Sequence, residues 1–96
     1  MTPLEGARLA QPPQLVWKTV PAATYYNVQL YRGGRKILSV WPTQSGFRLQ
    51  HSWTFGGRAY VLAPGRYRWY VWPGLGARSA NRYGKLIGTR TFVVTG

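Results

Sequence analysis

The sequence predicts an all-β fold, arranged as a two-sheet antiparallel β-sandwich of about seven strands. Glycine and proline interrupt the chain at short intervals, and no segment between them shows the period of an amphipathic helix. These segments are rich in aromatic and β-branched residues, which favour strands. Two of them alternate between apolar and polar positions, so each presents one apolar face to a core.

Residues 1–96 are expected to form a single domain with a modest core. We expect residues 1–6 to be a flexible N-terminal tail. Two short strands follow, at residues 7–10 and 15–18, and Pro12-Pro13 separates them because proline cannot donate a hydrogen bond to a strand ladder.

The third expected strand, residues 24–32, alternates clearly. One face carries Tyr26, Val28 and Leu30, and the other carries Tyr25, Asn27, Gln29 and Tyr31. Gly33-Gly34 then predicts a two-residue hairpin turn, because glycine tolerates positive φ at both positions. A fourth strand is expected at residues 36–41.

The fifth expected strand, residues 47–53, has the weakest pattern. The sixth, residues 66–72, places Tyr67, Trp69 and Val71 on one face and Arg66, Arg68, Tyr70 and Trp72 on the other. In the seventh, residues 86–95, Phe92 and Val94 are expected to point inward. Trp17 and Trp69 are the largest side chains expected in the core.

Several motifs along the chain resemble a fibronectin type III domain of the kind found in bacterial secreted and surface proteins. They are Leu15-x-Trp17, Tyr26-x-Val28-x-Leu30, Leu62-x-Pro64-Gly65-x-Tyr67 and Tyr67-x-Trp69-x-Val71. The resemblance extends over about residues 3–95 and implies an immunoglobulin-like sandwich. The long connection at residues 73–85 and the heavy segment at residues 47–58 depart from the family pattern.

The resemblance also implies a tyrosine corner, in which the Tyr67 hydroxyl bonds back to the backbone and fixes the crossing between the sheets. Together with the alternation, it defines an expected core. Its members are Leu15, Trp17, Tyr26, Val28, Leu30, Leu62, Pro64, Tyr67, Trp69, Val71 and Phe92.

The charged and nucleophilic residues argue against an enzyme. Glu5 is the only acidic residue, there is one His and no Asp or Cys, and thirteen Lys and Arg give a net charge of +12. General acid–base and nucleophilic catalysis need partnered groups of the kinds that are missing. His51 has no second ligand or base for a partner, so we expect no catalytic residue, no metal site and no cofactor.

The candidate binding site is a sheet face rather than a pocket. Its expected outward residues are Tyr25, Asn27, Gln29, Tyr31, Arg68, Tyr70 and Trp72. Aromatic rings interleaved with arginine suit stacking and anion binding. An alternative is that this face is covered, either by the loop at residues 73–85 or by apolar side chains of the fourth strand: Ile37, Leu38, Val40 and Trp41.

The expected function is that of a non-enzymatic interaction or spacer module that contacts a protein or an anionic cell-surface polymer. Two alternatives stay open: a basic nucleic-acid-binding β domain, and a carbohydrate-binding module with Tyr70 and Trp72 as stacking platforms. The stretches Arg32-Gly33-Gly34-Arg35 and Gly56-Gly57-Arg58 resemble the Arg-Gly-Gly segments of RNA-binding tails, but they are isolated, and the first is better explained as a hairpin turn.

The resemblance places the module outside the cell or on its surface, as part of a larger protein, although this chain carries no signal peptide. A cytoplasmic location is expected if the short chain is complete. No apolar run approaches the roughly 20 residues that cross a bilayer, so no membrane span is expected.

Overall fold

A computed structural model describes all residues, 1–96, and shows an all-β protein without an α-helix. It has nine strands rather than the seven expected, and no helix of the length and hydropathy that a membrane crossing requires. The strands are β1 (Ala7–Leu9), β2 (Gln14–Val16), β3 (Tyr25–Arg32), β4 (Arg35–Val40), β5 (Gly46–Arg48), β6 (Ser52–Phe55), β7 (Arg58–Val61), β8 (Gly65–Gly74) and β9 (Gly88–Val94). A single 3₁₀ turn, η1 (Arg78–Ala80), lies between β8 and β9.

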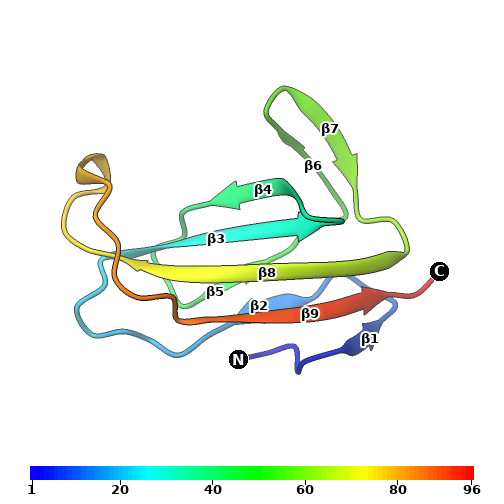
Figure 1. Cartoon of the computed structure of the whole chain (residues 1–96), viewed down its shortest axis with the longest axis horizontal. Helices are drawn as coiled ribbons and strands as arrows, with labels where there is room; N and C mark the ends of the chain where they lie inside the picture. The colour runs from blue at the N-terminus through cyan, green and yellow to red at the C-terminus, as the bar shows by residue number, and fades with distance from the viewer.

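Five strands form the main sheet, in the order β1-β9-β8-β3-β4 (Figure 1). Four of them pair antiparallel as expected, but β1 runs parallel to β9, with Ala7 opposite Phe92. The prediction of wholly antiparallel sheets is therefore wrong, and the main sheet is mixed. β1 and β9 come from opposite ends of the chain, so no tight turn between them imposes the antiparallel direction.

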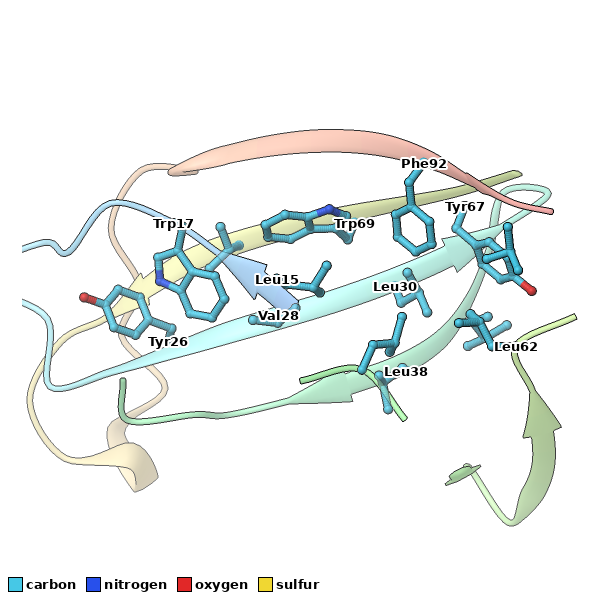
Figure 2. Packing of buried hydrophobic residues seen from close by; sticks show 14 residues of the cluster. Leu15, Trp17, Tyr26, Val28, Leu30, Leu38, Leu62, Tyr67, Trp69 and Phe92 are labelled. Atoms are coloured by element: carbon cyan, nitrogen blue, oxygen red, sulfur yellow. The ribbon is translucent and has the colours of Figure 1, made fainter. Parts of the chain in front are cut away.

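The remaining strands form two short antiparallel pairs, β2 with β5 and β6 with β7. Leu15 of β2 belongs to the same buried cluster as Val28 of β3 and Trp69 of β8 (Figure 2). The β6–β7 hairpin instead projects away from the main sheet beyond β4 (Figure 1). The first pair therefore covers the core along β2, while the hairpin reaches it only through Trp53 and Tyr60, which pack against the cluster from its margin.

The β6–β7 hairpin replaces part of the single strand expected at residues 47–53, which the structure divides between β5 and β6. Its turn is Gly56-Gly57, with φ of 60° and 76°. Gly33-Gly34 between β3 and β4 has nearly the same values, 58° and 76°. Both glycine pairs therefore make the two-residue turn that positive φ allows, and the second had not been predicted as one.

The buried cluster contains every side chain of the expected core except Pro64, which is exposed. Pro64 lies in the turn before β8, and its carbonyl accepts a hydrogen bond from Arg32 at 2.7 Å. Pro64 therefore lies on the surface at the start of β8, and the prediction that it belongs to the core was wrong. Four residues complete the cluster: Ile37, Leu38, Leu49 and Val94.

Residues 1–6 lie against the domain rather than extending from it as the flexible tail that was expected. The Thr2 N–H donates to the Val16 carbonyl at 2.9 Å, and the Val16 N–H donates back at 3.0 Å. Gly6 N–H donates to the Thr91 carbonyl of β9, also at 2.9 Å. The segment thus bonds to β2 through Thr2 and to the main sheet through Gly6.

Tyr67 makes the hydrogen bond expected of a tyrosine corner. Its hydroxyl donates to the Ala63 carbonyl at 2.6 Å and accepts from Arg32 Nη1 at 2.8 Å. The Arg32 guanidinium also lies 5.0 Å from the centre of the Tyr67 ring. Burial raises the pKa of Tyr67, while Arg32 acts in the opposite direction. The crossing into β8 is therefore fixed by one phenol and one guanidinium.

We expect Tyr67→Phe to lower the free energy of unfolding by about 1 to 2 kcal/mol, because it removes one hydrogen-bond donor and one acceptor at a partly buried site. Urea unfolding measures the difference. Tyr60→Phe is the matched control, since Tyr60 stacks on Trp53 in the β6–β7 hairpin and takes no part in the hydrogen bonds of the corner. Equal stabilities of the Tyr67→Phe variant and the parent would show that the corner bond contributes nothing.

Candidate functional site

The outer face of the main sheet is built by alternate residues of β3 and β8. The register pairs Gln29 with Tyr70 and Tyr31 with Arg68, and directly opposed residues of an antiparallel pair project from the same face. The next pair along, Asn27 with Trp72, follows the same rule. The inner face meanwhile carries the core residues of both strands. The alternation predicted from the sequence therefore selects the correct side of each strand.

Two members of the predicted face are not exposed. Tyr25 and Asn27 are only 4% and 5% exposed. The connection from β8 to β9 returns over this end of the sheet, and Tyr83 packs edge-to-face on Tyr25 with ring centres 5.8 Å apart. This burial raises the pKa of Tyr25. The covering loop that was considered as an alternative is thus present at this end, and placing these two residues on an open face was wrong.

Three aromatic side chains remain half-buried on the rest of the face, and we call them the aromatic row: Tyr31, Tyr70 and Trp72. Tyr31 meets Tyr70 nearly at right angles, with ring centres 5.3 Å apart. Tyr70 and Trp72 stack with an angle of 16° between their planes and 5.8 Å between their centres. The row runs across the middle of the face.

A chain of side-chain hydrogen bonds supports the aromatic row. The Tyr31 hydroxyl donates to Gln29 Oε1 at 2.9 Å, and Gln29 Nε2 donates to Asn27 Oδ1 at 2.7 Å. Asn27 Nδ2 then donates to Ser39 Oγ at 3.0 Å and to the Val40 carbonyl at 3.1 Å. Both amide oxygens are therefore used inside the protein. The arrangement holds the row in place and leaves few free acceptors on the floor of the face.

A basic hollow of about 750 Å³ lies at the Tyr31 end of the aromatic row. Its lining includes three arginines: Arg32, from the end of β3, and Arg66 and Arg68, from β8. Arg32 is engaged at the tyrosine corner, and Arg68 Nη1 makes one long hydrogen bond, 3.3 Å, to Thr89 Oγ1. Arg66 and Arg68 are both exposed. They can therefore donate to an anion without leaving a buried partner behind.

An aromatic hollow of about 470 Å³ lies at the other end of the row. Its aromatic members are Trp72, Trp41, Phe55 and Tyr83, and its polar members are Asn27, Gln29, Lys36 and Ser39. Trp41 Nε1 donates to the Tyr83 hydroxyl at 3.1 Å, which joins β4 to the covering loop. The Arg78 guanidinium lies 4.0 Å from the centre of the Trp41 ring.

Sequence reasoning missed most of the residues that complete these hollows. Trp41 was considered only as a cover, and Phe55 and Tyr83 only as part of segments that depart from the family pattern. Whether these residues line a hollow depends on where the β6–β7 hairpin and the β8–β9 loop lie in space, and the alternation of residues along a strand does not predict that. The unusual length of those two segments was the one available signal.

Glu5 lies at the edge of the basic hollow. Its carboxylate accepts hydrogen bonds from the Thr91 N–H, at 2.9 Å, and from the Thr91 hydroxyl. These bonds lower the pKa of Glu5, and Arg68 and Arg90 lower it further by charge. The only carboxylate side chain of the protein is thus hydrogen-bonded to the backbone and side chain of β9. The outer face of the main sheet therefore keeps a net positive charge.

We expect the protein to lose stability as the pH falls below about 4.5, the ordinary pKa of a glutamate. The folded-state pKa of Glu5 is lowered, so its contribution is present above that pH and is lost as the pH drops towards the folded value. Urea midpoints at pH 6 and pH 3 measure the loss. Glu5→Gln should reduce the difference in stability between pH 6 and pH 3, because no other side-chain carboxyl exists. An unchanged difference in that variant would show that Glu5 does not cause the loss of stability.

The structure assembles no group of three or more His, Cys, Asp or Glu side chains that could hold a metal ion. His51 is exposed in the connection between β5 and β6. Comparison of the chain with protein-family models, with curated proteins and with solved structures finds no match. A functional proposal for the chain therefore rests on the basic and aromatic side chains of the outer face of the main sheet.

Proposed function

We propose that the chain is a non-enzymatic β-sandwich module, of the immunoglobulin-like fibronectin type III class, that binds a negatively charged polymer on the outer face of its main sheet. Three features support the sandwich. The β2–β5 pair shares one core with the main sheet, and a tyrosine corner spans the start of β8. The N-terminal segment bonds to β2 through Thr2 and then pairs with β9, so it contacts both layers.

The main observation in favour of a binding function is that the basic hollow lies beside the half-buried aromatic row. Exposed arginines draw an anionic chain to the face, and a net charge of +12 with one acid adds a long-range field of the same sign. The rings supply apolar contact once the chain has arrived. Catalysis is the weaker explanation because no carboxylate, His or Cys lines either hollow, and the Glu5 carboxylate at the edge of the basic hollow already accepts from Thr91.

A paired substitution tests whether the site or the overall charge binds the polymer. We expect Arg66→Ser with Arg68→Ser to weaken binding of fluorescent dextran sulfate by about tenfold, as two exposed ion pairs of up to about 1 kcal/mol each would imply. Fluorescence anisotropy at ~50 mM salt measures this. The control removes the same charge from β1 and β5, through Arg8→Ser with Arg48→Ser, and should change the affinity less than threefold.

Equal losses in the two double variants would assign binding to the diffuse field and overturn the proposed site. Absence of binding by the parent protein would overturn the proposed function itself.

We also propose, from the resemblance to fibronectin type III domains, that the module belongs to an exported or surface protein. A signal peptide or further β domains encoded in the same reading frame would support this location. A reading frame confined to this chain, with neither, would favour the cytoplasm.

A further inference from the structure

We infer that the polymer is a single-stranded nucleic acid, with a base in the aromatic hollow and phosphates on Arg66 and Arg68. This inference rests on the proposed function and names the ligand of the same face. Each nucleotide of a nucleic acid combines a planar aromatic base with an anionic phosphate. The face has a matching pair of sites, since the aromatic hollow suits a base and the basic hollow suits phosphates.

The outward side chains of β8 form a linear track for such a strand. Arg66, Arg68, Tyr70 and Trp72 succeed one another on the same face. At about 3.3 Å per residue, they extend over about 20 Å. Two cations come first and two aromatic rings follow, so an extended chain that follows β8 meets anion contacts and then stacking contacts. Proteins that bind single strands combine a basic groove with stacking aromatics in this way.

The aromatic hollow suits a planar group. Tyr70 stacks against Trp72 on one side, while the indole borders the hollow. Trp41 and Tyr83, joined by their hydrogen bond, contribute further aromatic surface to its lining. The volume of about 470 Å³ lies within the range of sites that take small ligands or single units of a polymer. Lys36 supplies a cation at the same hollow.

An acidic polysaccharide fits the face less well. Its many hydroxyl groups need hydrogen-bond acceptors as well as donors, and arginine and lysine only donate. The amide oxygens of Gln29 and Asn27 already accept from Tyr31 and Gln29, and Glu5 already accepts from Thr91. The phosphodiester backbone of a nucleic acid needs donors alone. A duplex is disfavoured because its bases are paired and stacked, so presenting one to the hollow costs energy.

Fluorescence anisotropy with matched ligands tests the inference. A labelled oligonucleotide of twelve thymidines is compared with an abasic strand that has the same number of phosphates, with a duplex of the same length and with a hyaluronan oligosaccharide. We expect the thymidine strand to bind about tenfold more tightly than the abasic strand, as one stacked base implies, and more tightly than the other two ligands.

Equal affinity for the thymidine and abasic strands would overturn the inference while leaving the proposed function intact, and so would tighter binding of hyaluronan or of the duplex. If no polyanion binds at all, dextran sulfate included, the proposed function fails first. The two failures are thus distinguishable in one series of titrations.

Trp72→Ala should remove the tenfold preference for the thymidine strand, because the abasic strand has no base to stack on the indole. Trp53→Ala is the matched control, because Trp53 also stacks on a tyrosine at 16°, with ring centres 6.0 Å apart, but lies in the projecting hairpin. The hollow beside it has no cation in its lining. Arg66→Ser with Arg68→Ser should weaken both strands and reduce the slope of log K against log salt by about 1.4, roughly 0.7 for each contact.

A measurement on the unmodified protein covers the case in which Trp72→Ala does not fold. The five tryptophans give five indole N–H signals in a ¹⁵N-correlated NMR spectrum. Addition of the thymidine strand should shift the signals of Trp72 and Trp41 and leave that of Trp53 in place. A shift confined to Trp53, or no shift of Trp72 at saturation, would overturn the inference.

Discussion

Replacement of Trp69 by alanine should lower the free energy of unfolding by about 4 kcal/mol, a typical loss when a buried Trp or Phe is truncated to alanine. Trp69 is 0% exposed in the middle of β8 and packs against Trp17 with ring centres 6.1 Å apart. Its loss leaves a cavity at the point where β2 meets the main sheet. A domain of this size has only about 5 to 15 kcal/mol to lose, so a large unfolded fraction is expected at elevated temperature.

The comparison that isolates burial is Trp41→Ala, which removes the same side chain from a site that is 43% exposed. Its cost should stay below about 1.5 kcal/mol, since a half-exposed side chain loses the bond to Tyr83, the contact with Arg78 and little core packing. Urea unfolding of both variants provides the measurement, with Trp69→Phe as an intermediate if the alanine variant does not fold. Similar losses at positions 69 and 41 would mean that Trp69 is not central to the core.

Alternation predicted the inner and outer faces of β3 and β8 because the two-residue period of a strand is a local property. Burial of Val28, Leu30 and Trp69 followed from it directly. The Gly33-Gly34 turn was equally local, since positive φ at two glycines nearly determines the hairpin. The same reasoning applied to Gly56-Gly57 would have predicted the β6–β7 hairpin, but the weak pattern around it concealed the strands.

Contacts between distant segments were not predictable in the same way. The burial of Tyr25 depends on Tyr83, which is far along the chain and lies in an irregular loop. The parallel pairing of β1 with β9 depends on how the N-terminal segment crosses from β2, and no residue pattern states that direction. The candidate site is affected most, because its aromatic hollow is lined in part by such distant segments.

Gly74 links the fold to this hollow, and Gly74→Ala should lower the free energy of unfolding by about 2 to 3 kcal/mol. Gly74 pairs with Tyr25 in the sheet, and a Cβ at position 74 would overlap the Tyr25 ring. The ring is buried and cannot rotate freely, so the strands must separate or Tyr25 must leave its site. Overpacking of a filled core typically costs 1 to 3 kcal/mol.

Gly46→Ala is the appropriate control, because Gly46 is also a strand glycine without positive φ. Its nearest contact would be the amide nitrogen of Gln14 at 3.1 Å, the far end of a flexible side chain, so the change should cost less than about 1 kcal/mol. Equal costs at the two glycines, measured by urea unfolding, would show that the overlap with Tyr25 is relieved without penalty.

The same substitution separates the two halves of the face. Displacement of Tyr25 removes the surface on which Tyr83 packs, and Tyr83 lines the aromatic hollow together with Trp41 and Trp72. Arg66 and Arg68 lie at the opposite end of β8 and keep their positions. The folded Gly74→Ala variant should therefore retain dextran sulfate binding within about threefold while losing its preference for thymidine over abasic strands. Parallel loss of both activities would mean that the two hollows do not act as separate sites.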